Sequence, residues 1–210
     1  MITVTCILKS GSTIGYDSTW VEKLQRAVAR NLTQKHNFVC LTDMEVSCQS
    51  IPLIRNDPGV WSKLELFRPG LFDGPVLYID LDNIVCGNLD ELILKIQDQS
   101  FVMLHESDTL TVSSSIMWWQ GDYSHLWTQY CSKASEHWQK KYRKPKFADQ
   151  GFIEDHATYT LLQTHIPQKW IAWFSRHRID KSAKILVFRK ATSKPSTAQY
   201  QVEFIQQHWI

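Results

Sequence analysis

The hydrophobic and polar positions of this chain follow two patterns that alternate from one end to the other. Short apolar runs between polar loops are typical of buried strands, and such runs occupy residues 2–8, 38–41, 76–79, 101–104, 116–119 and 185–188. Segments with apolar residues at helical intervals lie between them, at residues 18–32, 61–67, 88–96, 123–138 and 202–209. This alternation predicts an α/β protein with a mostly parallel central sheet.

Local sequence features set several boundaries along the chain. The first helix is expected to begin near Ser18, with Thr19 and Glu22 at the spacing of a capping box. Residues 43–59 have no regular pattern and are interrupted by proline, so we expect irregular structure there. No internal repeat, low-complexity tract or linker divides the sequence, and we expect one domain over residues 1–210.

Composition and charge narrow the class of protein. With 43% hydrophobic and 21% charged residues, the chain has the profile of a soluble globular protein. Its net charge of +2 is too small to indicate a nucleic-acid partner. The five cysteines include no C-x-x-C pair and predict buried reduced thiols. The first apolar run lacks the flanks of a signal peptide and no segment is long enough to span a membrane, so we expect a cytoplasmic protein.

The apolar run at 76–79 leads directly into two aspartates, Asp80 and Asp82, separated by Leu81. Ligands of open α/β sheets bind beyond the carboxyl ends of such strands. Side chains two positions apart point the same way along a strand, so both carboxylates can turn toward one hard divalent cation such as Mn²⁺ or Mg²⁺. The simpler alternative is that the two aspartates only end the strand and open a turn.

At this motif the sequence resembles a known family. Asp80-Leu81-Asp82 is similar to the Asp-x-Asp motif of GT-A fold glycosyltransferases, and residues 87–92 resemble the glycogenin and galactosyltransferase-like group, family 8-like. That group transfers sugar from UDP-sugars with retention of configuration. Further segments follow in the order of the family, and they are Tyr16, residues 61–64, residues 113–117 and Asp149-Gln150. The resemblance covers roughly residues 2–155.

The resemblance implies a single Rossmann-like GT-A domain, the fold of nucleotide-diphospho-sugar transferases. It implies a nucleotide-binding half at 1–110 and an acceptor-side half at 111–210. It also implies that Asp80 and Asp82 bind Mn²⁺ or Mg²⁺, which holds the diphosphate of the UDP-sugar. The residues implied to contact the donor are Lys9, Tyr16, Lys63, Asp80, Leu81, Asp82, Ser114 and Ser115.

Each of these implied roles has a simpler alternative. Tyr16 would hold the uracil ring by stacking, but a loop tyrosine also packs on a neighbouring helix. Lys63 would lie over the diphosphate or the donor sugar, and the alternative is a lysine that keeps its charge at the surface. Ser114 and Ser115 carry hydroxyls that suit sugar oxygens, but a run of serines is also an ordinary loop.

The remaining implied site residues are Asp149, Gln150 and Arg189. The first two correspond to the element of the family that faces the anomeric carbon, which makes them the implied catalytic residues, for intermediate stabilisation or nucleophilic attack, although Asp149 is also suited to be a helix N-cap. Related enzymes place a metal-binding histidine after the last strand, where this chain has Arg189, and only Lys194-Pro195 matches the pattern that follows. An arginine cannot bind a cation, so we expect weak metal binding and a guanidinium that faces the diphosphate.

Residues 138–146 combine a tryptophan with five basic residues. They could contact an anionic membrane surface or a lipid-linked acceptor, or be a solvated helix end. Taken together, the resemblance implies a metal-assisted, retaining hexosyltransferase of polysaccharide biosynthesis that uses a UDP-sugar and a glycan or lipid-linked acceptor. It would be cytoplasmic, either free or peripheral at the inner membrane surface of a bacterium. The alternatives are a non-catalytic nucleotide-sugar or glycan binder and a sugar nucleotidyltransferase.

Overall fold

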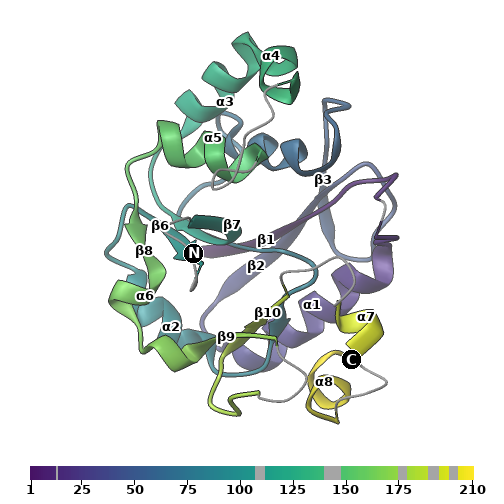
Figure 1. Ribbon diagram of the computed structural model, residues 1–210, viewed down its shortest axis with the longest axis vertical. Coiled ribbons are helices and arrows are strands. Elements are labelled where there is room, and N and C mark those ends of the chain that lie inside the picture. Colours follow the sequence, from purple (N-terminus) through teal and green to yellow (C-terminus); the bar gives the residue numbers. More distant parts are fainter. Residues whose placement is uncertain (13, 107–111, 140–147, 175–178, 189–193, 199–202) are drawn as a thin grey trace.

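The computed structural model describes the chain except residues 13, 107–111, 140–147, 175–178, 189–193 and 199–202 (Figure 1). A seven-stranded sheet has the order β3-β2-β1-β4-β7-β6-β8. Its strands are β1 Ile2–Leu8, β2 His36–Thr42, β3 Gln49–Pro52, β4 Val76–Ile79, β6 Phe101–His105, β7 Val112–Trp119 and β8 Thr160–Leu161. The first four of these run parallel, β7 is antiparallel to both β4 and β6, and β8 is parallel to β6. The expected mostly parallel α/β sheet is confirmed.

A smaller, three-stranded sheet joins the C-terminal part of the chain to the segment that follows the aspartate pair. It consists of β5 (Ile84–Val85), β10 (Ile185–Val187) and β9 (Ile171–Trp173), in this order. The central strand β10 is antiparallel to β5 and parallel to β9. This pairing brings residues near position 185 close to the end of β4.

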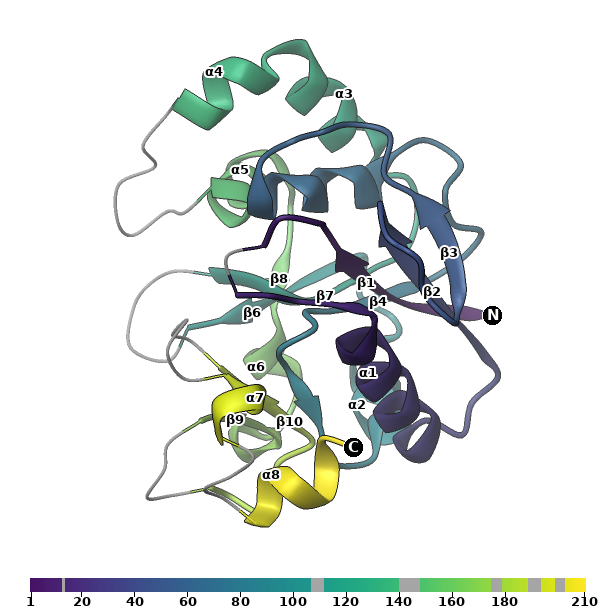
Figure 2. The ribbon, with the colours of Figure 1, turned by 90° about the vertical axis from the view of Figure 1, so that its right-hand side faces the viewer.

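Helices cover both faces of the main sheet (Figure 2). The α-helices are α1 Ser18–Asn31, α2 Leu89–Ile96, α3 Ser124–Ser132, α4 Ala134–Gln139, α5 Ala148–His156, α6 Leu162–His165, α7 Pro195–Ala198 and α8 Glu203–His208. The 3₁₀ helices are η1 Gly59–Phe67 and η2 Gln168–Trp170. Helices α1 and α2 lie on one face, and α3, α4 and α5 lie on the other. Among the described residues, no helix is long and apolar enough to cross a membrane.

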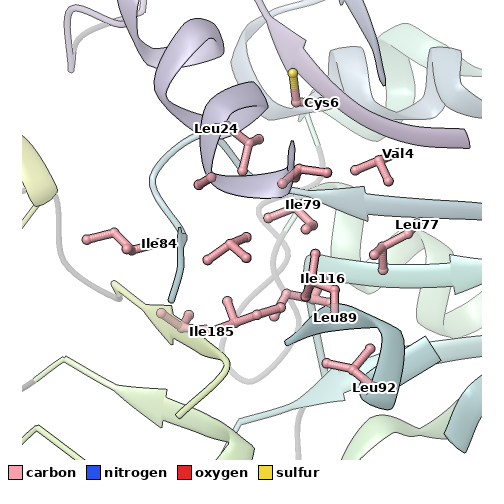
Figure 3. Close-up of a cluster of buried hydrophobic side chains, with 14 of the residues drawn as sticks. Val4, Cys6, Leu24, Leu77, Ile79, Ile84, Leu89, Leu92, Ile116 and Ile185 are labelled. Atoms are coloured by element: carbon pink, nitrogen blue, oxygen red, sulfur yellow. The ribbon is translucent and has the colours of Figure 1, made fainter. Parts of the chain in front are cut away.

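Strand β4 is buried on both faces, as its sequence predicts. Leu77 and Ile79 pack into the cluster under α1 and α2 (Figure 3), whereas Val76 and Tyr78 pack toward η1, α3 and α5. Because successive side chains of a strand point to opposite faces, one four-residue strand contributes to both cores. The position where this strand ends is therefore fixed from both sides.

Several expected local features differ in detail. The first helix is capped by Asp17, whose carboxylate accepts from the Thr19 amide at 3.0 Å, and not by the predicted capping box. Residues 43–59 contain the edge strand β3, and the helix expected at 61–67 is the 3₁₀ helix η1. The helical region expected at 123–138 is divided into α3 and α4. Asp149 is the second residue of α5, so it is not the N-cap of that helix.

Candidate active site

One cavity of about 680 Å³ contains every predicted site residue that the structure describes. It opens where β1 and β4 end, and its wall includes η1, the first residues of α5 and the ends of β9 and β10. The predicted residues in this wall are Lys9, Tyr16, Lys63, Asp80, Leu81, Asp82, Ser114, Ser115, Asp149 and Gln150. Proximity does not test their roles, which remain predictions. Arg189 and the basic residues of 140–146 lie outside the described residues.

Asp80 lines the cavity and directly follows β4. Its backbone amide donates to the Ser115 carbonyl at 2.9 Å, which continues the pairing of β4 with β7. Its carboxylate contacts the Lys63 ammonium at 2.9 Å and accepts a hydrogen bond from the Tyr78 hydroxyl. The side chain of Lys63 is only 10% exposed, so it is not the surface lysine of the simpler alternative.

Asp82 has a matching pair of partners. The Tyr16 hydroxyl donates to its carboxylate at 2.7 Å, and the Lys194 ammonium forms an ion pair with the same oxygen. Burial and the neighbouring carboxylates raise the pKa of Tyr16 and of Tyr78 above the usual value, so both phenols stay protonated and donate. Each aspartate is therefore held by one ammonium and one phenol.

Further buried polar groups line the cavity next to Lys63. The Ser114 hydroxyl donates to Asp149 at 2.6 Å, and the Lys63 ammonium lies 3.1 Å from the Ser114 hydroxyl and 3.7 Å from Asp149. Burial raises the pKa of Asp149 although Lys63 and Ser114 oppose this effect. Burial also disfavours the Lys63 ammonium, but Asp80 and Asp149 outweigh it and raise the pKa of this lysine. Gln150 follows Asp149 in the cavity wall.

The loop after β1 is held in place by Asp43, the residue that follows β2. Asp43 accepts from the Ser10 amide and the Ser10 hydroxyl, both at 2.7 Å, and from the Lys9 ammonium at 2.5 Å. Partial burial raises the pKa of Asp43, but the hydrogen bonds from Lys9 and Ser10 outweigh it and lower the value to about 2. Lys9 also donates to Asn56 at 3.0 Å. The ring of Tyr16 packs edge-on against Trp20, with centroids 4.8 Å apart.

The carboxylates of Asp80 and Asp82 are the hard oxygen ligands that suit Mn²⁺ or Mg²⁺, and both reach the cavity. In the described part of the chain, no group of three or more His, Cys, Asp or Glu side chains could hold a metal ion. A metal would therefore have two protein carboxylates here, and it would compete with Lys63 and Lys194 for them.

Two residues of this centre were missed by sequence reasoning. Tyr78 precedes Asp80 by two positions, so the strand period alone would place both on one face. Lys194 was noted only as part of a Lys-Pro match, although its ammonium lies against Asp82. Its contact with Asp82 spans 112 residues of sequence, so no local pattern indicates it.

The search of family models found no match to the sequence, and no curated protein matches it. The structure is similar to that of the glycosyltransferase GlyE of Streptococcus pneumoniae TIGR4, with a TM-score of 0.64 and 13% identity over 99% of this chain. It is similar to an active-site mutant of LgtC (TM-score 0.63, 9% identity, 99% of this chain) and to the bifunctional WbbM (0.61, 11%, 99%). The chain spans 60% of the GlyE chain, 96% of the LgtC chain and 50% of the WbbM chain.

At identities of 9–13%, these similarities describe the fold and do not assign an activity or a substrate. The closer resemblance to the family 8-like group remains a prediction. The chain thus has the GT-A fold of these glycosyltransferases, as its sequence predicts.

Proposed function

We propose that this protein is a glycosyltransferase that moves a hexose from a UDP-sugar to a glycan or lipid-linked acceptor, with metal assistance and with retention of configuration. The observation that carries the proposal is one cavity that joins the loop after β1, the aspartate pair and the buried Ser114–Asp149 pair. Its volume of about 680 Å³ lies in the range of small-molecule ligand sites. A solved structure of LgtC holds donor and acceptor sugar analogs, which supports a ligand of this class.

Transfer breaks the bond between the anomeric carbon and the β-phosphate oxygen, so negative charge grows on the departing diphosphate. The ammoniums of Lys63 and Lys194 lie in the cavity wall, where they can offset this charge. A divalent cation bound by Asp80 and Asp82 would add Lewis-acid stabilisation of the same oxygens. Tyr16 offers its ring to the uracil, and Leu81 fills the wall between the two aspartates.

Ser114 and Ser115 are proposed to bind the hydroxyls of the donor sugar, and Asp149 and Gln150 to face the anomeric carbon as the catalytic residues. The carboxylate of Asp149 has accepted one hydrogen bond from Ser114 and has capacity for more. A front-face substitution requires no covalent nucleophile. Asp149 can therefore stay next to the Lys63 ammonium, 3.7 Å away, during the transfer. In this scheme, residues 1–110 bind the nucleotide and residues 111–210 bind the acceptor. Lys194 belongs to the second half but forms an ion pair with Asp82 in the first.

One observation favours a second candidate, a non-catalytic relative that binds nucleotide-sugars. Both aspartates already have ammonium partners, so the aspartate pair is charge-compensated without a metal. Such a protein would bind the donor and release no product. A sugar nucleotidyltransferase remains less supported, because residues 9–15 have only part of the glycine-rich, arginine-containing loop that it needs.

The test is thermal unfolding with UDP, GDP, CMP and dTDP, each with and without Mn²⁺. A ligand that binds only the folded state stabilises it by about 2.7 kcal/mol at a hundredfold excess over Kd. We expect UDP to raise Tm most, with a further rise when Mn²⁺ is present. Equal effects of all four nucleotides, or none, would remove the UDP-sugar proposal. Release of UDP from UDP-hexoses then separates the enzyme from the non-catalytic binder.

A further inference from the structure

The two aspartates of the cavity are held in the same way, by groups from different parts of the chain. Asp80 contacts Lys63, 17 residues before it, and Asp82 contacts Lys194, 112 residues after it. Both lysine side chains are at least nine-tenths buried, with 10% and 8% of their surface exposed. Each carboxylate also accepts from a phenol, Tyr78 or Tyr16. The pairing is therefore built into the fold and is not a chance contact at the surface.

This arrangement opposes a metal ion that arrives alone. Lys63 lies against both carboxylate oxygens of Asp80 and Lys194 against one oxygen of Asp82, so a divalent cation would compete with two ammoniums for these oxygens and be repelled by them at short range. The three carboxylates of Asp80, Asp82 and Asp149 and the two lysines sum to a formal charge of −1. A divalent cation alone would change this sum to +1, whereas a diphosphate that arrives with it returns the site to negative charge.

We propose that Lys63 and Lys194 act as exchangeable counter-ions: they hold Asp80 and Asp82 until a nucleoside diphosphate binds, then transfer to its phosphate oxygens and leave the carboxylates to the metal. This inference rests on the proposed function and deepens it. Metal and nucleotide then bind as a coupled pair, and each raises the affinity for the other by the same factor.

The side chains of this site suit such an exchange. A lysine ammonium is a point charge with three donors on a flexible stem. Unlike an arginine, it has no bidentate geometry to lose when it changes partners. When Lys63 leaves Asp80, the Ser114 hydroxyl at 3.1 Å and Asp149 at 3.7 Å remain next to its ammonium. The hydroxyls of Tyr78 and Tyr16 continue to donate to the two carboxylates, which keeps them oriented toward the cavity.

The experiment measures Mn²⁺ binding directly, from the electron paramagnetic resonance signal of free Mn²⁺, with and without UDP. Lys194→Gln removes the charge but keeps a donor for Asp82, and Lys63→Gln tests the other aspartate independently. Lys184→Gln is the matched control, since Lys184 is equally buried and pairs with Glu91 at 2.7 Å outside the cavity wall. Thermal unfolding verifies that each variant is folded.

We expect the parent to bind Mn²⁺ at least about tenfold more tightly with UDP than without it. Without UDP, Lys194→Gln and Lys63→Gln should bind Mn²⁺ about tenfold more tightly than the parent, and UDP should add less. The control should behave like the parent. Folded lysine variants with parental Mn²⁺ affinity in the absence of UDP would overturn the inference while UDP binding stands. Failure of UDP to bind with or without Mn²⁺ would instead overturn the proposed function and the exchange together.

Discussion

Tyr16 makes two kinds of contact in the cavity, one through its ring and one through its hydroxyl, and two substitutions can separate them. Its ring lines the cavity and packs against Trp20, while its hydroxyl donates to Asp82 at 2.7 Å. Tyr16→Phe removes only the hydroxyl, and Tyr16→Ala removes the ring as well. If the ring is the platform for uracil, the first change should affect stability and the second should affect nucleotide affinity.

The magnitudes follow from the contacts. A hydrogen bond to a charged group contributes about 1.5–3 kcal/mol, and Asp82 keeps its Lys194 partner in the variant. We therefore expect Tyr16→Phe to lower the free energy of unfolding by about 1–2 kcal/mol and to change UDP affinity less than about threefold, since a phenyl ring stacks as well. Loss of an aromatic platform costs about 1–3 kcal/mol per base, so Tyr16→Ala should weaken UDP roughly 5- to 150-fold.

Calorimetric titration with UDP in the presence of Mn²⁺ gives the affinities, and urea unfolding gives the stabilities. Tyr123→Ala is the matched control, because Tyr123 packs edge-on against Phe101 with centroids also 4.8 Å apart, outside the cavity wall. It should lose stability without losing UDP affinity. Equal weakening of UDP by Tyr16→Phe and Tyr16→Ala would refute the platform and assign the effect to the Asp82 contact. Unchanged UDP affinity in both would leave Tyr16 a packing residue.

Three further predictions concern the aspartate pair, the Asp149–Gln150 element and Asp43. Asp82→Asn should remove the Mn²⁺-dependent gain in UDP affinity more completely than Asp80→Asn, and an undiminished gain in calorimetry would exclude both as metal ligands. Asp149→Asn and Gln150→Ala should lower kcat far more than donor affinity, as expected of groups that act mainly in the transition state; a pure rise in donor KM would assign both to binding. The pKa of Asp43, about 2 in the folded protein, lies below its usual value of about 4. Its contribution to stability should be complete above pH about 4 and lost as the pH falls toward about 2, and Asp43→Asn should flatten that part of the urea-unfolding profile.

The parts of the fold that the sequence predicts well are those with a strong period. Strand β4 and helix α1 bury continuous or regularly spaced apolar residues, and both lie where they were expected. Strand β3 was missed because it lies at the edge of the sheet and three of its four residues are exposed, which leaves no apolar pattern. The two-residue strands β5 and β8 carry too little sequence to show any period.

The same reasoning separates the predictable part of the site from the rest. Asp80 and Asp82 follow a buried strand, so local sequence places them at the edge of the sheet where ligands bind. The counter-ion of Asp82 comes from Lys194, and no local pattern links positions 112 residues apart. Lys63 was implied by the family resemblance, but its ion pair with Asp80 depends on how η1 packs over β4 and β7.

Asp149 provides a test that separates a site residue from a structural one. Burial raises its pKa, so the ionised carboxylate costs free energy that the fold does not recover from Lys63 and Ser114. For a group whose pKa is raised by folding, stability is greatest below the unfolded pKa and falls as the pH rises through the folded value. Asp149→Asn cannot ionise, so at neutral pH it should be at least as stable as the parent in urea while its turnover falls. A residue kept for stability alone would give the opposite result, a less stable variant with the turnover of the parent. Buried charges that cost stability and gather around one cavity are expected where a ligand requires them.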